Sequence, residues 1–123
     1  MTNAGNWDAQ LKKGLVELCI LAMAVEKERY GYELTSALSS ADGFSVPEGT
    51  VYPVLRRLAA DGLLESRWEE SSSGPPRKYY RATPRGVARL DQLISQWRVT
   101  TAAVDRFIND IQEGRGSGRS GEL

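Results

Sequence analysis

The sequence contains no histidine, and its 123 residues include a single cysteine. The absence of histidine excludes Ser–His and Cys–His nucleophile pairs and metal sites with histidine ligands. Cys19 has no partner for an intrachain disulfide, which is typical of a reducing compartment. Its apolar neighbours Leu18, Ile20 and Leu21 favour a buried thiol over the alternative of a redox sensor. A phosphate-binding glycine loop is also missing, so we predict no enzymatic activity, cofactor or metal.

Long apolar runs and an excess of one charge are missing as well. No run approaches the length of a membrane span, and Met1–Gly5 lacks the pattern of a signal peptide. We therefore expect a cytoplasmic protein with no membrane partner. Lys and Arg total 16, as do Asp and Glu, so any affinity for nucleic acid has to come from a local basic patch.

The stretch from Val46 to Thr83 organises the chain, and it begins with a predicted helix. Ser45 and Glu48 have the spacing of a capping box, and Pro47 suits the first turn. Asp61-Gly62 ends the helix, because glycine favours the left-handed conformation after the last turn. The predicted buried face consists of Val51, Val54, Leu55 and Leu58.

The opposite face of this helix combines small residues with hydrogen-bond donors. Small residues allow close approach, arginine bridges guanine acceptors, and hydroxyls bond phosphates, so this face suits the major groove of DNA. The residues predicted to bind DNA from this helix are Thr50, Tyr52, Pro53, Arg56 and Arg57. The alternative is that the two arginines are ordinary solvated charges.

Two predicted strands, residues 63–70 and 77–83, follow this helix. The intervening residues 71–76, Ser-Ser-Ser-Gly-Pro-Pro, are turn formers that cannot extend either strand. A hairpin directly after a capped helix is the layout of a winged helix. We predict that Arg77 and Lys78, on the return strand, contact DNA phosphates. Three glutamates on the outgoing strand count against a uniformly basic hairpin.

Two helices are predicted ahead of this unit. The second of them, a short turn and the capped helix follow the helix-turn-helix order, with the capped helix as the recognition helix. The first runs from about residue 7 to 26 after a frayed N-terminus, and its apolar stripe consists of Leu11, Leu15, Leu18, Ala22 and Val25. Residues 27–31 form a turn. The second helix covers residues 32–41 and is expected to face inward with Leu34, Ala37, Leu38 and Ala41. Tyr32 is a predicted phosphate donor, and Trp7 packs against either a partner subunit or the domain's own edge.

A long last helix is predicted at residues 84–112, with Thr83 as its N-cap. Its apolar residues repeat at spacings of three and four over more than three heptads, apart from Thr101. So small a domain cannot bury such a stripe, which favours dimerisation over packing on its own domain. The residues predicted at the dimer interface are Trp7, Leu11, Leu90, Ile94, Trp97, Val104, Ile108 and Ile111. Residues 113–123 are predicted to be a disordered tail.

Three ordered motifs resemble the PadR family of bacterial transcriptional regulators. They are residues 49–58, Gly-Thr-Val-Tyr-Pro-Val-Leu-Arg-Arg-Leu; residues 62–64, Gly-Leu-Leu; and residues 77–86, Arg-Lys-Tyr-Tyr-Arg-Ala-Thr-Pro-Arg-Gly. Residues 30–34, Tyr-Gly-Tyr-Glu-Leu, are similar to the family's second-helix signature. A single C-terminal helix resembles the smaller subgroup. The resemblance implies a dimeric winged-helix repressor that is often relieved by a small aromatic ligand.

A ligand site is predicted around Trp97, on the dimer stripe. In a two-fold dimer the two Trp97 rings could face each other, with Leu15, Leu18 and Ile94 as apolar walls. A planar aromatic molecule would stack between the rings. The resemblance supports this prediction, because multidrug-binding members of the family carry a tryptophan in the same region. The alternative is that the rings stack on each other and leave no room.

The sequence as a whole predicts a mainly α fold with a small β-hairpin. A winged helix-turn-helix domain occupies residues 7–83, a dimerisation helix residues 84–112, and the tail residues 113–123. The predicted function is a homodimeric DNA-binding regulator that recognises an inverted repeat in double-stranded DNA, as a repressor released by an aromatic ligand. The alternative is a winged-helix module that binds another protein and not DNA. Salt dependence separates the two, because phosphate contacts weaken steeply with salt.

Overall fold

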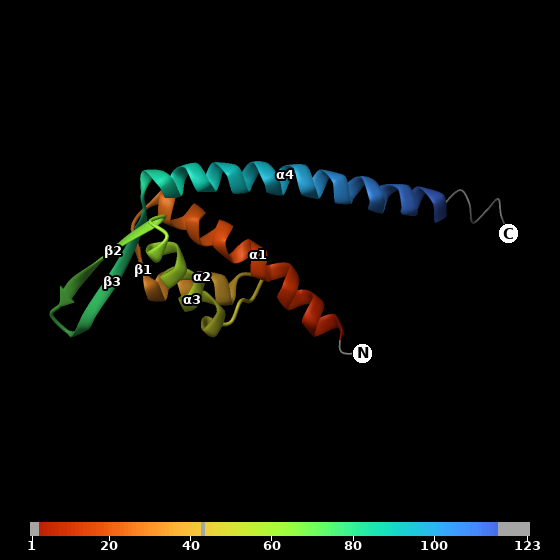
Figure 1. The fold of residues 1–123 in the computed structure, drawn as a ribbon. Coiled ribbons are helices and arrows are strands. Elements are labelled where there is room, and N and C mark those ends of the chain that lie inside the picture. Colours follow the sequence, from red (N-terminus) through yellow and green to blue (C-terminus); the bar gives the residue numbers. More distant parts are fainter. Residues whose placement is uncertain (1–2, 43, 116–123) are drawn as a thin grey trace. The chain divides into compact units, whose positions relative to one another are not determined.

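The computed structural model describes residues 3–42 and 44–115, and its fold is mainly helical with one small sheet (Figure 1). Its elements are α1 Asn3–Glu26, β1 Arg29–Tyr30, α2 Gly31–Ser40, α3 Glu48–Ala60, β2 Leu64–Ser71, β3 Gly74–Ala82 and α4 Pro84–Glu113. The chain divides into two compact units, residues 1–91 and 92–123, and the boundary falls within α4. The predicted fold class is confirmed: helix-turn-helix, hairpin and long last helix follow one another.

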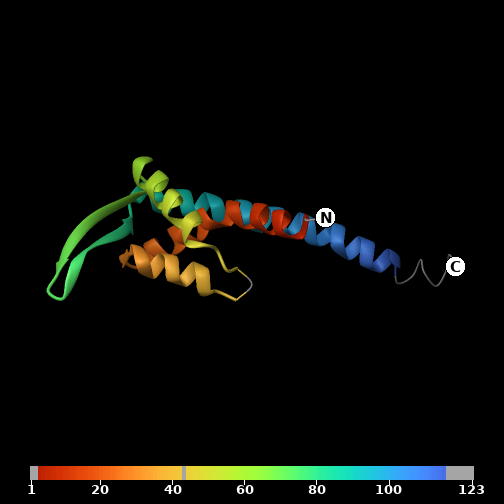
Figure 2. The same cartoon turned by 90° about the horizontal axis from the view of Figure 1, so that it is seen from below.

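The core of the first unit forms where α1, α2 and α3 meet the base of the sheet. Its buried apolar residues from these helices are Val16, Ile20, Leu21, Ala24, Leu34, Leu38, Val51, Leu55 and Leu58. The predicted buried face of α3 is therefore confirmed, with Val54 half-buried. Helix α2 begins and ends one residue earlier than predicted, and Ala37, expected to face inward, is exposed. Figure 2 shows α2 and α3 beside the hairpin, which extends away from them.

The buried face of α1 differs from the predicted one. Val16, Ile20 and Ala24 are at most 3% exposed, whereas Leu11 and Val25 on the predicted stripe are 49% and 38% exposed. The helix also begins earlier than predicted, at Asn3. Because α1 is apolar on two sides, periodicity alone could not say which side its own domain covers. The predicted stripe is thus an exposed or half-exposed apolar face.

The capping box predicted from Ser45 and Glu48 is not formed at the start of α3. The helix begins at Glu48, its N-cap is Pro47, and no side chain caps it. Ser45 belongs to the turn that leaves α2: its φ is 36°, and its N–H donates to the carbonyl of Ala41 at 3.1 Å. The predicted end is right, because Gly62 follows the helix with φ 77°, in the left-handed region.

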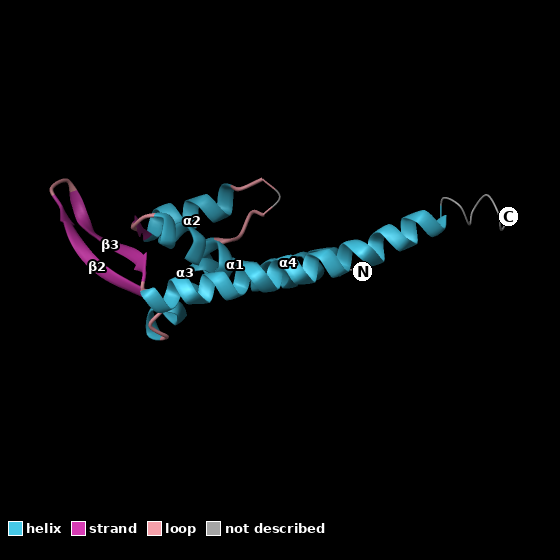
Figure 3. Ribbon diagram, turned by 90° about the horizontal axis from the view of Figure 1, so that it is seen from above, coloured by secondary structure: helices cyan, strands magenta, loops and turns pink. Residues whose placement is uncertain are grey.

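The sheet has three antiparallel strands in the order β1-β3-β2, and the prediction missed β1. Figure 3 shows the hairpin that β2 and β3 form. A strand of two residues is too short to show the alternation of apolar and polar residues by which strands are predicted. The hairpin turn is also tighter than predicted, because β3 begins at Gly74 and includes Pro75 and Pro76. These prolines are tolerated at the outer end of the hairpin, where the ladder is irregular between Glu69 and Ser71 and β1 does not reach.

The first turns of α4 pack closely on the end of the preceding helix and strand. Thr83 caps α4 as predicted: its Oγ1 accepts the N–H of Gly86 at 3.0 Å and donates to the carbonyl of Gly62 at 2.7 Å. A Cβ on Gly86 would lie 2.1 Å from the carbonyl oxygen of Leu63, so only glycine fits there. Leu90 is 7% exposed in this unit, so little of its side chain is left for the predicted dimer interface.

Beyond Gln92, α4 exposes large apolar side chains. Four members of the predicted stripe are 44–56% exposed: Trp97, Val104, Ile108 and Ile111. Val99 and Phe107, outside that stripe, are 64% and 71% exposed. No helix in the described part of the chain is both long and apolar enough to cross a membrane. The predicted tail begins with Glu113, which is the last residue of α4, and residues 116–123 lie outside the described part.

Candidate nucleic-acid interface

The outer surface of α3 carries the residues predicted to read DNA. Tyr52 is 37% exposed, Pro53 and Arg56 are exposed, and Thr50 is half-buried. Within the described part of the chain, Arg56 takes part in none of the ion pairs. Its guanidinium therefore keeps its donors for an external acceptor.

Arg57 has a different environment. Its Nη2 lies 3.1 Å from Oε1 of Glu17 in α1, and its Nη1 lies 3.8 Å from Oδ2 of Asp61. The other oxygen of Glu17 accepts from Nε of Arg89 in α4 at 3.0 Å. Glu17 thus links three helices through two arginines. The predicted DNA contact of Arg57 would have to compete with these carboxylates.

The two faces of the hairpin differ in charge. Residues directly opposite each other in antiparallel strands share a face, and successive residues alternate. From the register, one face carries Ser66, Trp68, Lys78 and Tyr80, which we call the inner wing face. The other carries Glu65, Arg67, Glu69, Arg77, Tyr79 and Arg81, which we call the outer wing face. Arg77 and Lys78, both predicted to contact DNA, therefore lie on opposite faces.

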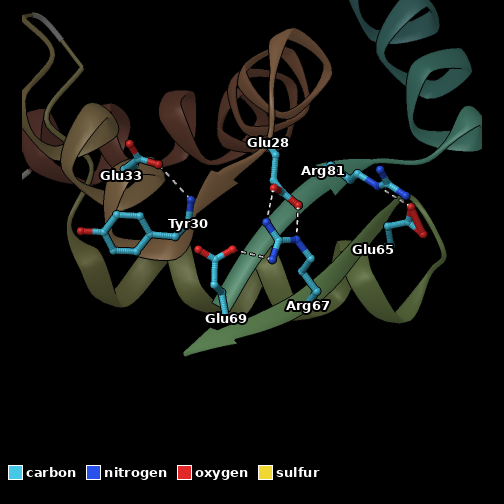
Figure 4. A network of polar contacts seen from close by, with 7 residues as sticks. All are labelled: Glu28, Tyr30, Glu33, Glu65, Arg67, Glu69 and Arg81. Carbon is cyan, nitrogen blue, oxygen red and sulfur yellow. Dashed lines mark hydrogen bonds and ion pairs between the residues drawn. The ribbon is translucent and has the colours of Figure 1, made fainter. Parts of the chain in front are cut away.

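Carboxylates on and beside the outer wing face are neutralised by arginines (Figure 4). Arg67 binds Glu28 through two bonds of 2.7 and 2.8 Å and Glu69 through one of 2.7 Å, and Arg81 binds Glu65 at 2.7 Å. The hydrogen bonds from Arg67 hold the pKa of the Glu28 carboxyl below its ordinary value. Two of the three glutamates that count against a basic hairpin, Glu65 and Glu69, are thus paired with arginines. They lie on the outer wing face, whereas Lys78 lies on the inner wing face.

The inner wing face is continuous with α3. A Cβ on Gly31 would lie 3.5 Å from Cε1 of Tyr52 and 3.6 Å from Cε1 of Tyr80, so both rings pack around this glycine. Burial raises the pKa of the Tyr80 hydroxyl, nearby Tyr52 raises it further, and the positive charge of Arg56 lowers it. The Lys78 ammonium lies 5.8 Å from the centroid of the Tyr80 ring. Arg56 and Lys78 therefore lie on either side of two tyrosines, of which Tyr52 is exposed and Tyr80 is buried.

Tyr32 and Arg77 belong to another cluster. Tyr32 is 58% exposed at the start of α2, and its ring centroid lies 6.2 Å from that of Tyr30. The guanidinium of Arg77 lies 4.7 Å from the same Tyr30 centroid. The N–H of Tyr30 donates to Glu33 at 3.0 Å, which fixes the start of α2. Tyr32 and Arg77 thus both pack near the ring of Tyr30.

Sequence reasoning missed two residues here, the exposed Trp68 and the buried Tyr80. Trp68 is identifiable from the sequence only as a strand former, yet it is 65% exposed on the inner wing face, and Tyr80 joins that face to α3. Alternation along β2 and β3 is visible in the sequence, but the register that brings their faces together is not. The prediction for Trp7 concerns a side chain outside the described part of the structure.

Comparisons with known proteins agree with this arrangement. The model of the transcriptional regulator PadR-like family matches residues 20–92. A transcriptional regulator of Mycobacterium tuberculosis is 43% identical over 83 residues, which are 68% of this chain and 76% of that protein. A PadR family regulator structure from Eggerthella lenta has a TM-score of 0.75 and 33% identity, over 85% of this chain and 91% of that one. A PadR-like regulator structure from Bacillus cereus has a TM-score of 0.71 and 36% identity, over 80% and 96%. The chain belongs to the PadR-like family of transcriptional regulators.

Proposed function

We propose that this regulator is a homodimeric repressor that binds an inverted repeat in double-stranded DNA and is released by a planar aromatic ligand. The observation that carries DNA binding is the surface bordered by Arg56 and Lys78, two cations outside the ion pairs of the described residues. Local charge of this kind supplies phosphate affinity even where net charge is zero. The repressor role rests on the resemblance to the family.

Dimerisation is supported by apolar faces that the single chain leaves open. On α1, Leu11 is 49% exposed, and on α4, Trp97, Val104 and Ile108 are 44–47% exposed. Single exposed apolar residues are common, but two long series of them mark an interaction surface. A second copy of the chain carries the same exposed apolar residues, so a two-fold axis would place the apolar surface of one copy against that of the other. One recognition helix per subunit then implies half-sites about 10 base pairs apart, or a multiple of that.

Arg56→Ala is expected to cost about 1–3 kcal/mol of binding free energy on the operator and to relax its sequence preference, because arginine reads base edges. Lys78→Ala is expected to weaken binding evenly across sequences, because lysine meets phosphate. Gel shifts on DNA upstream of the protein's own gene, and on the same bases in scrambled order, measure both effects.

The matched control for these variants is Arg81→Ala. It removes an equal charge from the hairpin that carries Lys78, but on the outer wing face, where Arg81 pairs with Glu65. Affinity should change little. If Arg56→Ala and Lys78→Ala both leave operator binding intact, α3 and the inner wing face are not the DNA-binding surface.

A winged-helix module that binds another protein is the second candidate, and the balanced net charge supports it. The two candidates differ in their response to salt. Affinity that falls linearly with log salt indicates released counterions and therefore phosphate contacts. An affinity for duplex DNA that is independent of salt, or absent, would favour the protein partner.

The ligand site is proposed at Trp97, whose ring is 44% exposed. Ile94 is half-buried on the same helix, and Leu15 and Leu18 are half-buried on the apolar face of α1. Near a two-fold axis the Trp97 ring meets its own copy, and a planar molecule between the rings gains stacking and burial. Such a ligand lowers operator affinity only if it binds the two dimer conformations unequally.

Trp97→Ala is expected to abolish the binding of planar cationic dyes and phenolic acids, because it removes both stacking surfaces of the dimer. The measurement is a titration followed by ligand fluorescence or calorimetry, with wild type and variant at equal dimer concentration. Val99→Ala, on a different side of the same part of α4, is the control and should bind as wild type. Undiminished binding by Trp97→Ala would place the pocket elsewhere.

A further inference from the structure

Trp68 is a large side chain for which the fold has no evident use. Its indole is 65% exposed although it lies in the middle of β2. An exposed indole forgoes the stabilisation that burial of so large an apolar surface would give. Exposed aromatic side chains at the centre of a polar surface are typical of contact sites.

The Lys78 ammonium has a defined position beside this ring. Lys78 is directly opposite Trp68 in the sheet, and its Nζ lies 5.5 Å from the centroid of the indole. Attraction to the ring face restricts the lysine side chain without neutralising its charge, as a carboxylate would. The inner wing face therefore presents an apolar plane and a positive charge side by side.

This combination is complementary to the backbone of DNA, in which deoxyribose alternates with charged phosphate. We propose that Trp68 and Lys78 hold one backbone strand of duplex DNA next to the groove that α3 enters. The indole packs on a deoxyribose, and the ammonium pairs with the adjacent phosphate. The inference rests on the proposed function and adds to it a contact that does not depend on base sequence.

Charge and continuity favour DNA over a protein as the occupant. Two glutamates of β2 lie on the outer wing face and are paired with arginines there. The third, Glu70, lies beyond Trp68 toward the hairpin turn, where the ladder is irregular. The inner wing face keeps the cation Lys78, and its buried residue Tyr80 packs around Gly31 together with the exposed Tyr52 of α3. Trp68 and Lys78 therefore lie nearer the base of the hairpin than Glu70 does.

The wing that carries this pair is anchored at its base. Arg67 on β2 binds Glu28, which lies between α1 and β1, and its guanidinium lies 5.0 Å from the centroid of the Tyr79 ring. The rings of Tyr30 and Tyr79 join β1 to β3 with a centroid distance of 5.6 Å. Such links restrict the strands before binding and so reduce the entropy cost of docking on DNA.

The test is a fluorescence-anisotropy titration of two labelled duplexes of equal length, the upstream DNA and its scrambled sequence. Trp68→Ala is expected to weaken binding to both duplexes roughly tenfold, because it removes an apolar contact with the backbone. Trp68→Phe should retain most of the affinity. In a salt titration, Trp68→Ala should keep the wild-type slope, whereas Lys78→Ala should lower it by about 0.9 for each phosphate that is no longer neutralised.

Fold and assembly of each variant are checked by circular dichroism and sedimentation. For the wild-type complex, hydroxyl-radical footprinting should show protected deoxyriboses flanking the groove occupied by α3, and this measurement needs no variant. Unchanged DNA binding by Trp68→Ala would overturn the inference, and so would footprinting that shows no protected deoxyriboses. The proposed function would still stand in that case if Arg56→Ala loses DNA binding. A loss confined to the upstream duplex would also overturn the inference, since it would indicate base readout. A wild type that binds neither duplex would overturn both proposals.

Discussion

Ile108→Asp is expected to convert the protein into a weakly associating monomer or an unfolded chain. The side chain is 45% exposed on the apolar stripe of α4 and is proposed to be buried by a second copy. A two-fold dimer would bury the introduced carboxylate twice, which costs at least about 3 kcal/mol and weakens association roughly 100-fold or more. Sedimentation velocity over a range of protein concentrations measures the change.

Val99→Asp is the matched control for this substitution. Val99 is 64% exposed on the same helix, and nine residues at about 100° each place it on the side opposite Ile108. The two variants therefore share the helix, the type of wild-type residue and the introduced charge. Val99→Asp should remain dimeric. A wild type that is a folded monomer at micromolar concentration, or two variants that behave alike, would contradict the proposed interface.

Gly86→Ala is expected to lower the free energy of unfolding by about 3 kcal/mol. An added Cβ would lie 2.1 Å from the carbonyl oxygen of Leu63, which is backbone and cannot move aside as a flexible side chain would. Relief requires α4 to move away from Leu63, and overpacking of this kind costs about 1–3 kcal/mol or more. The same movement disturbs the hydrogen bond from the Thr83 N–H to the Leu63 carbonyl, at 3.1 Å.

Gly49→Ala provides the comparison for Gly86→Ala. Gly49 lies in the first turn of α3, as Gly86 lies in the first turn of α4, but nothing lies within 4 Å of a Cβ at that position. It should be neutral or stabilise by up to about 1 kcal/mol, because alanine is the better helix former. Urea unfolding at one fixed protein concentration compares the two, since dimerisation contributes to stability. Equal stability of both variants would show that α4 accommodates the methyl group.

The sequence by itself determined the elements that depend on local chemistry. The apolar spacing of Val51, Leu55 and Leu58 defined the buried face of α3, and Gly62 its left-handed end. Thr83 fixed the start of α4, because its hydroxyl bonds a backbone N–H three residues on. These features involve neighbours within a turn or two, so their physical causes are complete within a short stretch of chain.

The tertiary structure decided what depends on partners distant in sequence. The sequence of α1 has apolar residues on two sides of the helix. Packing against the rest of the domain buries the side with Val16 and Ile20. In the sequence, Arg57 cannot be distinguished from Arg56; in the structure, Glu17 of α1 forms an ion pair with Arg57. The distribution of charge on the wing likewise depended on strand register, because successive residues of a strand lie on opposite faces. The register places two of the hairpin's glutamates on the outer wing face, where they pair with arginines. Burial and ion pairing are set by which side chains meet across the fold, and a one-residue shift in register would exchange the two wing faces.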